Sequence, residues 1–247
     1  MHWEGGQGAS AHSETLHRFY ATLLESFGPQ AWWPARTRWE VICGAILTQN
    51  TNWRNASLAI KNLRKARALA RRPLLQLPLP ELEALVRPAG FYRQKARALH
   101  NFATWIEQAH GGSLDSLFSL GTAEARQQLL AQTGIGPETA DAILLYSGRH
   151  ATFVADAYTR RVLARHNLLS PTADYDAAQQ FLHQHLPPRE DMFNEFHALL
   201  VETAKRYCQR NVIHCERCPL GKYFERNSKL EIRNSEGHSG FDSRVAP

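Results

Sequence analysis

The chain has 247 residues, of which 43% are hydrophobic and 21% charged, which is ordinary for a globular protein of one large domain or two small ones. No apolar run reaches the roughly 18 residues of a membrane span, and the polar start lacks the apolar core of a signal peptide, so we expect a cytoplasmic protein. The 29 basic and 23 acidic residues give a formal charge of +6, which favours nucleic acid as a partner without excluding other roles.

Helical periods follow one another along the chain, and there is little strand signal. Short breakers rich in proline and glycine separate them. The predicted helices cover residues 13–27, 38–48, 51–68, 79–86, 92–110, 123–133, 138–147, 157–166, 175–186 and 195–207. We predict a flexible N-terminus at 1–12 and, because the last residues are polar and aperiodic, a disordered tail at 227–247. The pattern therefore predicts an all-α fold.

Two glycines, Gly134 and Gly136, lie between two of these helical patterns. Glycine allows a positive φ and lets a phosphate approach the backbone closely. Pro137 suits the first turn of the next helix, whose free N–H groups and positive dipole end then face the turn. Such a hairpin can hold a DNA phosphate without reading sequence, although a plain corner between two helices would show the same letters.

A carboxylate, Asp156, lies 20 residues after Gly136, behind the apolar residues 153–155 and before a helix that carries Arg160 and Arg161. Alone, Asp156 could simply cap that helix. Hairpin and carboxylate together resemble the helix-hairpin-helix DNA glycosylase superfamily, whose best-known member is endonuclease III. The resemblance covers residues 13–224 and implies that Asp156 is the catalytic carboxylate.

The same resemblance implies a fold with two lobes. The six-helix lobe with the hairpin is expected at residues 39–150, and the second lobe at 13–38 together with 151–226, ending in a cysteine loop. Gln49 matches the glutamine that enters the space left by a flipped base. The implied partner is duplex DNA with a damaged base. The protein is expected to be a monomer and to have no membrane partner. The expected DNA-binding residues are Gln49, Gly134, Gly136, Thr139, Arg160 and Arg161.

Glu138 stands where bifunctional members of the family carry a lysine that forms a Schiff base with the sugar. A carboxylate cannot form an imine, so the resemblance implies base removal by water without strand cleavage. Asp156 would stabilise the positive charge that develops at C1′, and Glu138 would help to position the base or the water. Glu138 could also be an exposed charge that merely favours a helix start.

Aromatic residues surround the expected site in the sequence. Trp32, Trp33 and Pro34 precede the apolar helix at 38–48, and Trp53 follows Gln49. Tryptophan is often core filler, but enzymes that flip bases need flat apolar walls. With Glu138 and Asp156, this set resembles the 3-methyladenine glycosylase branch, in which aromatic rings sandwich an alkylated purine. We expect Trp32 and Trp53 to supply the two faces, and Trp33 and Pro34 to line the edge.

Three clustered cysteines, Cys208, Cys215 and Cys218, follow the pattern C-x6-C-x2-C. The endonuclease III pattern continues to a fourth cysteine at position 224, where this chain has Phe224. The three thiolates could hold an iron–sulfur cluster of the [4Fe-4S] type that lacks its fourth cysteine, or zinc with His214. A loop without metal is the third reading. Iron content and visible absorption distinguish the three. Cys43 is expected in the core.

The predicted function is thus a monofunctional DNA glycosylase of base excision repair that acts on alkylated purines. One alternative is an endonuclease III-like glycosylase for oxidised pyrimidines with lyase activity from another lysine, for instance Lys205. Another is a DNA-binding protein that has kept the hairpin and lost the chemistry. Asp156 argues against the last alternative, because a carboxylate in a phosphate-binding cleft repels DNA.

Overall fold

The computed structural model describes residues 11–224. The predicted tail at 227–247 and the first ten residues of the predicted flexible start lie outside this range, while residues 11 and 12 belong to the first helix. Within the described range the chain is all-α, as predicted, with one isolated bridge between Cys208 and Ile213. No helix among residues 11–224 is long and apolar enough to cross a membrane.

Twelve α-helices follow in chain order within the described part. They are α1 Ala11–Phe27, α2 Arg38–Leu47, α3 Trp53–Lys65, α4 Arg71–Gln76, α5 Leu79–Val86, α6 Tyr92–His110, α7 Leu114–Phe118, α8 Thr122–Leu130, α9 Pro137–Ile143, α10 Ala157–Arg165, α11 Tyr175–His185 and α12 Glu190–Arg206. Four short elements add to them: the 3₁₀ turns η1 Arg87–Ala89, η3 Cys215–Arg217 and η4 Pro219–Tyr223, and the π-helical turn η2 Leu144–Gly148.

Two short helices, α4 and α7, were not expected, and α12 begins earlier than the expected residue 195. Pro73 looked like a breaker, but it lies in the first turn of α4, where its missing N–H is tolerated. Ser113 caps α7, and its hydroxyl accepts a hydrogen bond from the N–H of Ser116. Glu190 and Asp191 suit the first turn of α12 because they face the positive end of the helix dipole.

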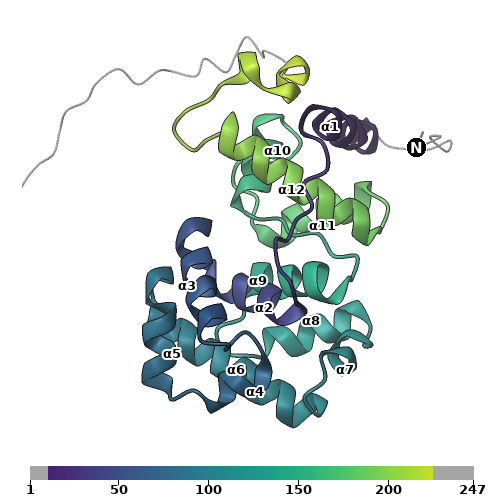
Figure 1. The fold of residues 1–247 in the computed structure, drawn as a ribbon. Coiled ribbons are helices and arrows are strands. Elements are labelled where there is room, and N and C mark those ends of the chain that lie inside the picture. Colours follow the sequence, from purple (N-terminus) through teal and green to yellow (C-terminus); the bar gives the residue numbers. More distant parts are fainter. Residues whose placement is uncertain (1–10, 225–247) are drawn as a thin grey trace, which may run out of the picture.

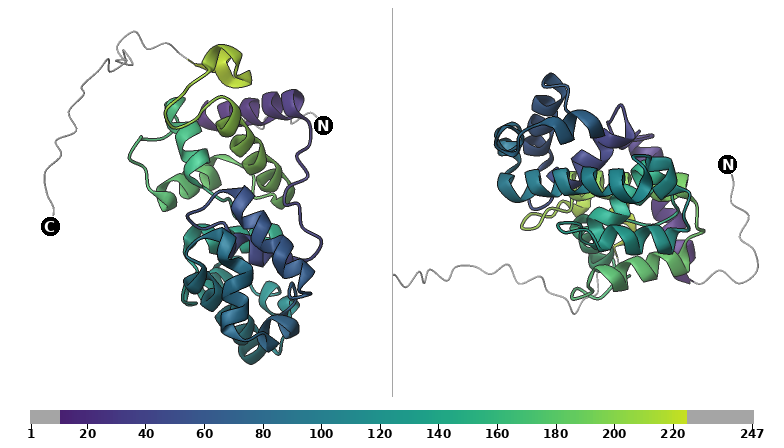
Figure 2. Two further views of the ribbon diagram at one scale, coloured as in Figure 1. Left: turned by 60° about the vertical axis from the view of Figure 1, so that its left-hand side comes forward. Right: turned by 90° about the horizontal axis from the view of Figure 1, so that it is seen from below.

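The helices form two groups. In Figure 1, α2 to α9 lie together below, and α1, α10, α11 and α12 lie above with the yellow C-terminal turns. The left view of Figure 2 shows the same two groups. The chain passes between them twice, after α1 and again after η2. We infer that these groups are the two lobes that the sequence predicts.

The core of the first group surrounds α2. Every residue from Glu40 to Leu47 is buried, which explains why this helix is apolar on nearly all sides. It packs against α3, α6, α9 and η2. Cys43 is fully buried there, as expected, and burial raises the pKa of its thiol to about 12. This thiol is therefore a packing group rather than a nucleophile.

Candidate active site

The hairpin between α8 and α9 requires glycine at its turn. Gly134 has a φ of +89°, and a Cβ there would approach the Cβ of Ala98 on α6 to 3.0 Å. Ile135 is buried and anchors the turn, whereas Gly136 is exposed and takes the N-cap position of α9. The turn thus lies close to α6 and leaves the start of α9 open to an anion.

Gln49 is fixed to this hairpin. Its side-chain amide donates to the carbonyl of Gly134 at 2.9 Å and to the hydroxyl of Thr139 at 2.8 Å. Thr139 is 6% exposed, so its hydroxyl holds Gln49 in place rather than facing solvent. The buried ammonium of Lys95 donates to the carbonyls of Leu47 and Ala89, which ties the end of α2, two residues before Gln49, to η1.

Asp156 caps α10 and also faces a pocket. Its Oδ1 accepts a hydrogen bond from the N–H of Thr159 at 2.7 Å, and its Oδ2 lies 3.5 Å from Nε2 of His197. Burial raises the pKa of Asp156, but the interaction with the imidazole of His197 and the hydrogen bonds at Thr159 together lower it below the usual value. The carboxylate is therefore ionised at neutral pH. Asp156 can cap α10 and act in the pocket at the same time, because Oδ1 accepts the capping hydrogen bond and Oδ2 is left for the chemistry.

Glu138 lies in the first turn of α9 and lines the same pocket. Its side chain stays accessible at the pocket mouth. Desolvation on the pocket side and the charge of Asp156 raise the pKa of Glu138 above the usual value. The environment thus drives the two carboxylates in opposite directions, Asp156 toward the ionised form and Glu138 toward the protonated one.

The pocket has a volume of about 290 Å³, and aromatic rings form much of its wall. Trp32, Trp33 and Trp53 contact one another, with ring centroids 5.2 to 5.3 Å apart. Trp33 also packs on Tyr146 and on Gly44, where a Cβ would approach its ring to 2.9 Å. The glycine in α2 therefore makes room for Trp33.

The expected sandwich is not preformed. The rings of Trp32 and Trp53 are inclined at 59° and are too close for a flat base between them, since stacking on both faces needs roughly 7 Å. A sandwiched base would require one of these rings to rotate. Pro34 is not among the residues that line the pocket. The structure thus brings together three of the four expected wall residues.

Two polar lining residues, Tyr146 and His197, had no role in the sequence interpretation, and a third, Lys205, entered it only as an alternative nucleophile. The Nζ of Lys205 lies 5.7 Å from the ring centroid of Trp32, a cation–π contact. His197 is buried, Tyr146 is partly buried, and the two are hydrogen-bonded to each other. Buried polar side chains on helices at 144–148 and 190–206 look like core residues in a sequence, so only the fold could place them here.

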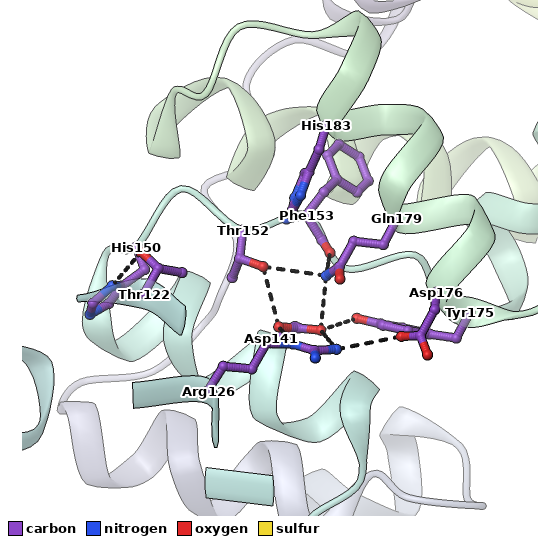
Figure 3. A network of polar contacts seen from close by, with 10 residues as sticks. All are labelled: Thr122, Arg126, Asp141, His150, Thr152, Phe153, Tyr175, Asp176, Gln179 and His183. Carbon is purple, nitrogen blue, oxygen red and sulfur yellow. Dashed lines mark hydrogen bonds and ion pairs between the residues drawn. The ribbon is translucent and has the colours of Figure 1, made fainter. Parts of the chain in front are cut away.

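A buried acid, Asp141, fixes the hairpin against the loop that carries Asp156 (Figure 3). Arg126 on α8 donates to both carboxylate oxygens at 2.9 and 3.1 Å. Thr152, Tyr175 and Gln179 donate to the same group. These donors come from α8, the loop before Asp156, and α11, so one fully buried carboxylate joins both groups of helices. Glu138, one turn earlier on α9, is positioned by the same anchor.

A second hollow, of about 430 Å³, lies on the other side of Gln49. Phe91 stands at it, 63% exposed and with a φ of +43°, which is unusual for an aromatic residue. Arg97 and Asn101 on α6 also line it. The sequence interpretation missed Phe91. In the sequence, the signal that could have indicated Phe91 is an aromatic residue directly after a glycine in a segment between two helices.

The two expected DNA-binding arginines on α10 are partly engaged within the protein. Arg160 donates to the carbonyl of Ala173, and Arg161 donates to the carbonyl of Cys208. Arg161 also lies over the ring of Tyr158. Only the guanidinium N–H groups of Arg160 and Arg161 that these contacts do not use can donate hydrogen bonds to a DNA phosphate.

The cysteine loop offers an incomplete ligand set. Cys208 accepts a hydrogen bond from Arg165 at its Sγ, and the pKa values of Cys215 and Cys218 are raised by burial and by the neighbouring thiols. Phe224 packs edge-on against His166. Among residues 11–224 no three His, Cys, Asp or Glu side chains converge as a metal site. The iron–sulfur and zinc readings stay predictions, and no chemistry below depends on them.

The chain was compared with known proteins. A family model described as HhH-GPD superfamily base excision DNA repair protein matches residues 43–188. A candidate DNA repair glycosylase of Methanocaldococcus jannaschii is 39% identical over 211 residues, which are 85% of this chain and 96% of that protein. Endonuclease III of Thermotoga maritima is 26% identical and covers 78% of this chain and 87% of its own length.

Solved structures are similar as well. The H. pylori 3-methyladenine DNA glycosylase bound to 1,N6-ethenoadenine has a TM-score of 0.68 and 27% identity, and covers 79% of this chain and 97% of its own. A non-covalent endonuclease III–DNA complex has a TM-score of 0.74 at 17% identity, with 86% and 95% covered, and this likeness concerns the fold alone.

Proposed function

The chain belongs to the HhH-GPD superfamily of base excision DNA repair proteins and is a DNA N-glycosylase, and we propose that it is monofunctional and removes alkylated purines of the 3-methyladenine type from duplex DNA. The observation that carries the proposal is one pocket that joins three tryptophans to the ionised Asp156. The likeness to the H. pylori 3-methyladenine glycosylase supports the choice of lesion.

The chemistry follows from the two carboxylates. As the bond from C1′ to the base breaks, the sugar gains positive charge, which the free oxygen of Asp156 stabilises in the aromatic-walled pocket. The same oxygen can accept a proton from the attacking water. Glu138, biased toward its protonated form, can donate a hydrogen bond to the departing base. An alkylated purine carries positive charge and leaves readily, so this modest help suffices.

We assign the binding of the DNA backbone to the hairpin. The exposed Gly136 and the open start of α9 suit one phosphate, and Gln49 is held ready beside them by its bonds to the hairpin. We assign to Gln49 the space that the flipped base leaves in the duplex, as the family resemblance implies. Lys205 lies over the ring of Trp32, whereas within residues 11–224 no cation–π contact involves Trp53, so we assign to Trp53 the main stacking contact with a cationic base.

The one lysine that lines the pocket is poorly suited to attack the sugar. A Schiff base requires the amine to reach C1′, whereas Nζ of Lys205 is placed over the face of Trp32, 5.7 Å from its ring centroid. Base removal therefore proceeds by hydrolysis. The second candidate, a lyase that uses Lys205, deserves a test because this amine is present in the pocket.

Borohydride trapping is that test. Incubated with duplex DNA that contains an abasic site, the wild-type protein is expected to give no covalent complex, because Glu138 stands where the lysine would be and Lys205 is placed over Trp32. The measurement is a denaturing gel, with a bifunctional glycosylase as positive control. A trapped band would contradict the monofunctional proposal, and its loss in Lys205→Met, with DNA binding retained, would establish the second candidate.

A further inference from the structure

His197 occupies a special place behind the proposed catalytic carboxylate. It lies on α12, is 6% exposed, and directs Nε2 at Oδ2 of Asp156 from 3.5 Å. On its other side, Nδ1 is hydrogen-bonded to the hydroxyl of Tyr146, which belongs to η2 at the end of the hairpin helix. The three side chains thus form a line, Tyr146 to His197 to Asp156, from one group of helices to the other.

The direction of the protons along this line follows from chemistry. Burial, together with the carboxylates of Asp156 and Glu195, raises the pKa of Tyr146 well above its usual value, so the phenol stays neutral. If its O–H donates to Nδ1 of His197, Nε2 carries the proton and faces Asp156 with a donor. The opposite arrangement would place a bare ring nitrogen against a carboxylate, where two acceptors repel.

The contact with Asp156 is electrostatic rather than a closed hydrogen bond. Within the described residues, Nε2 of His197 is buried without a hydrogen-bond partner at normal distance. Oδ2 of Asp156 therefore remains able to accept from water or to face the sugar, whereas Oδ1 is committed to the cap of α10. Contacts with Tyr146 and Phe153 fix the imidazole ring.

We propose that Tyr146 and His197 are a positioning pair that directs Oδ2 of Asp156 into the pocket and keeps this carboxylate ionised during base release. The proposal rests on the proposed function only in taking Asp156 as the catalytic carboxylate, whichever base is removed. Other charged or titratable groups face Asp156 or its pocket: Glu138 from α9, Lys205 from α12 and Arg160 from α10. Burial opposes ionisation of Asp156, so the pair must offset it.

The test is the pH dependence of the single-turnover rate of base release in His197→Gln and Tyr146→Phe. In His197→Gln the burial of Asp156 persists while its largest lowering contribution disappears, so its pKa rises. We expect the acid limb of the profile to move to higher pH, and the rate at neutral pH to fall at least about tenfold. Tyr146→Phe keeps the ring, frees the imidazole, and should shift the limb in the same direction by less.

The matched control is His166→Gln, a partly buried histidine, which packs on Phe19 and Phe224 and does not line the pocket. This change is expected to lower stability and to leave the acid limb unchanged. Binding to abasic duplex, measured for each variant, separates lost positioning from lost folding. A limb that stays in place in His197→Gln would overturn the proposal, whether the rate falls or not.

Failure of the pair and failure of the proposed function are distinguishable. The substrate is whichever lesion duplex the wild-type protein acts on, so a wrong choice of lesion leaves the test intact. If Asp156→Asn is inactive while His197→Gln keeps the rate and pH profile of the wild type, Asp156 is the catalytic carboxylate and the positioning role of Tyr146 and His197 is wrong.

Discussion

Asp156→Asn is expected to reduce base release by about a thousandfold while DNA binding is retained. The carboxylate acts where positive charge develops at C1′, and removal of one preorganised electrostatic contact in an enclosed site typically costs about 10²–10³ in rate. Asparagine is a fair test because it can still cap α10 through the bond that Oδ1 makes with Thr159. The fold should therefore survive the change.

Two measurements accompany that result. The thermal midpoint of Asp156→Asn should lie close to that of the wild type, and its affinity for abasic duplex should be equal or higher, because one negative charge has left the cleft. Single-turnover base release gives the rate. A variant that is stable, binds DNA and releases bases at the wild-type rate would remove Asp156 from the mechanism.

Trp53→Leu is expected to weaken action on alkylated purines by about 10- to 100-fold. Stacking of a base on an aromatic ring is worth about 1–3 kcal/mol, and leucine retains apolar surface but no electron-rich face. The loss should appear in kcat/KM for methylated purines, while binding to abasic duplex, which offers no base to stack, changes little. Trp53→Phe should recover much of the activity.

The matched control for Trp53 is Trp105→Leu. Trp105 contacts Phe102 and His110 in the first group of helices and does not line the pocket. Any loss there reports on stability alone. Equal kcat/KM in Trp53→Leu and the wild type would show that Trp53 is core filler, as tryptophan often is.

The sequence predicts the hairpin and its carboxylate because both depend on local chemistry. Gly134 needs a positive φ, Pro137 needs a first turn, and Asp156 is a cap whose spacing from the turn is visible in the letters. The all-α fold follows from periodicity in the same way. Short helices such as α4 are harder, because six residues carry little periodic signal.

The rest of the pocket depends on packing between distant segments. Tyr146 and His197 come from η2 and α12, 51 positions apart, and each alone looks like a buried helical residue. Pro34 adjoins Trp33 in sequence but does not line the pocket, and Thr139 points its hydroxyl at Gln49. No local pattern determines these outcomes, which arise from how the two groups of helices meet.

The anchor at Asp141 is a further example. In the sequence it is one acid within a helical pattern, three residues after Glu138. In the structure it is fully buried and accepts hydrogen bonds from four side chains (Figure 3). A charge can be buried only when it is paired, and its partners lie up to 38 positions away, so the sequence offers no local sign of its role.

The central claim is that the pocket hydrolyses the glycosidic bond of alkylated purines and leaves the strand intact. The most direct measurement incubates the protein with duplex DNA that contains methylated purines, separates the free bases, and examines the strands before any alkali treatment. Free 3-methyladenine with intact strands is the predicted result. Absence of free methylated base, with strands cut in duplex that contains oxidised pyrimidines, would contradict both the assigned lesion and the role given to Glu138.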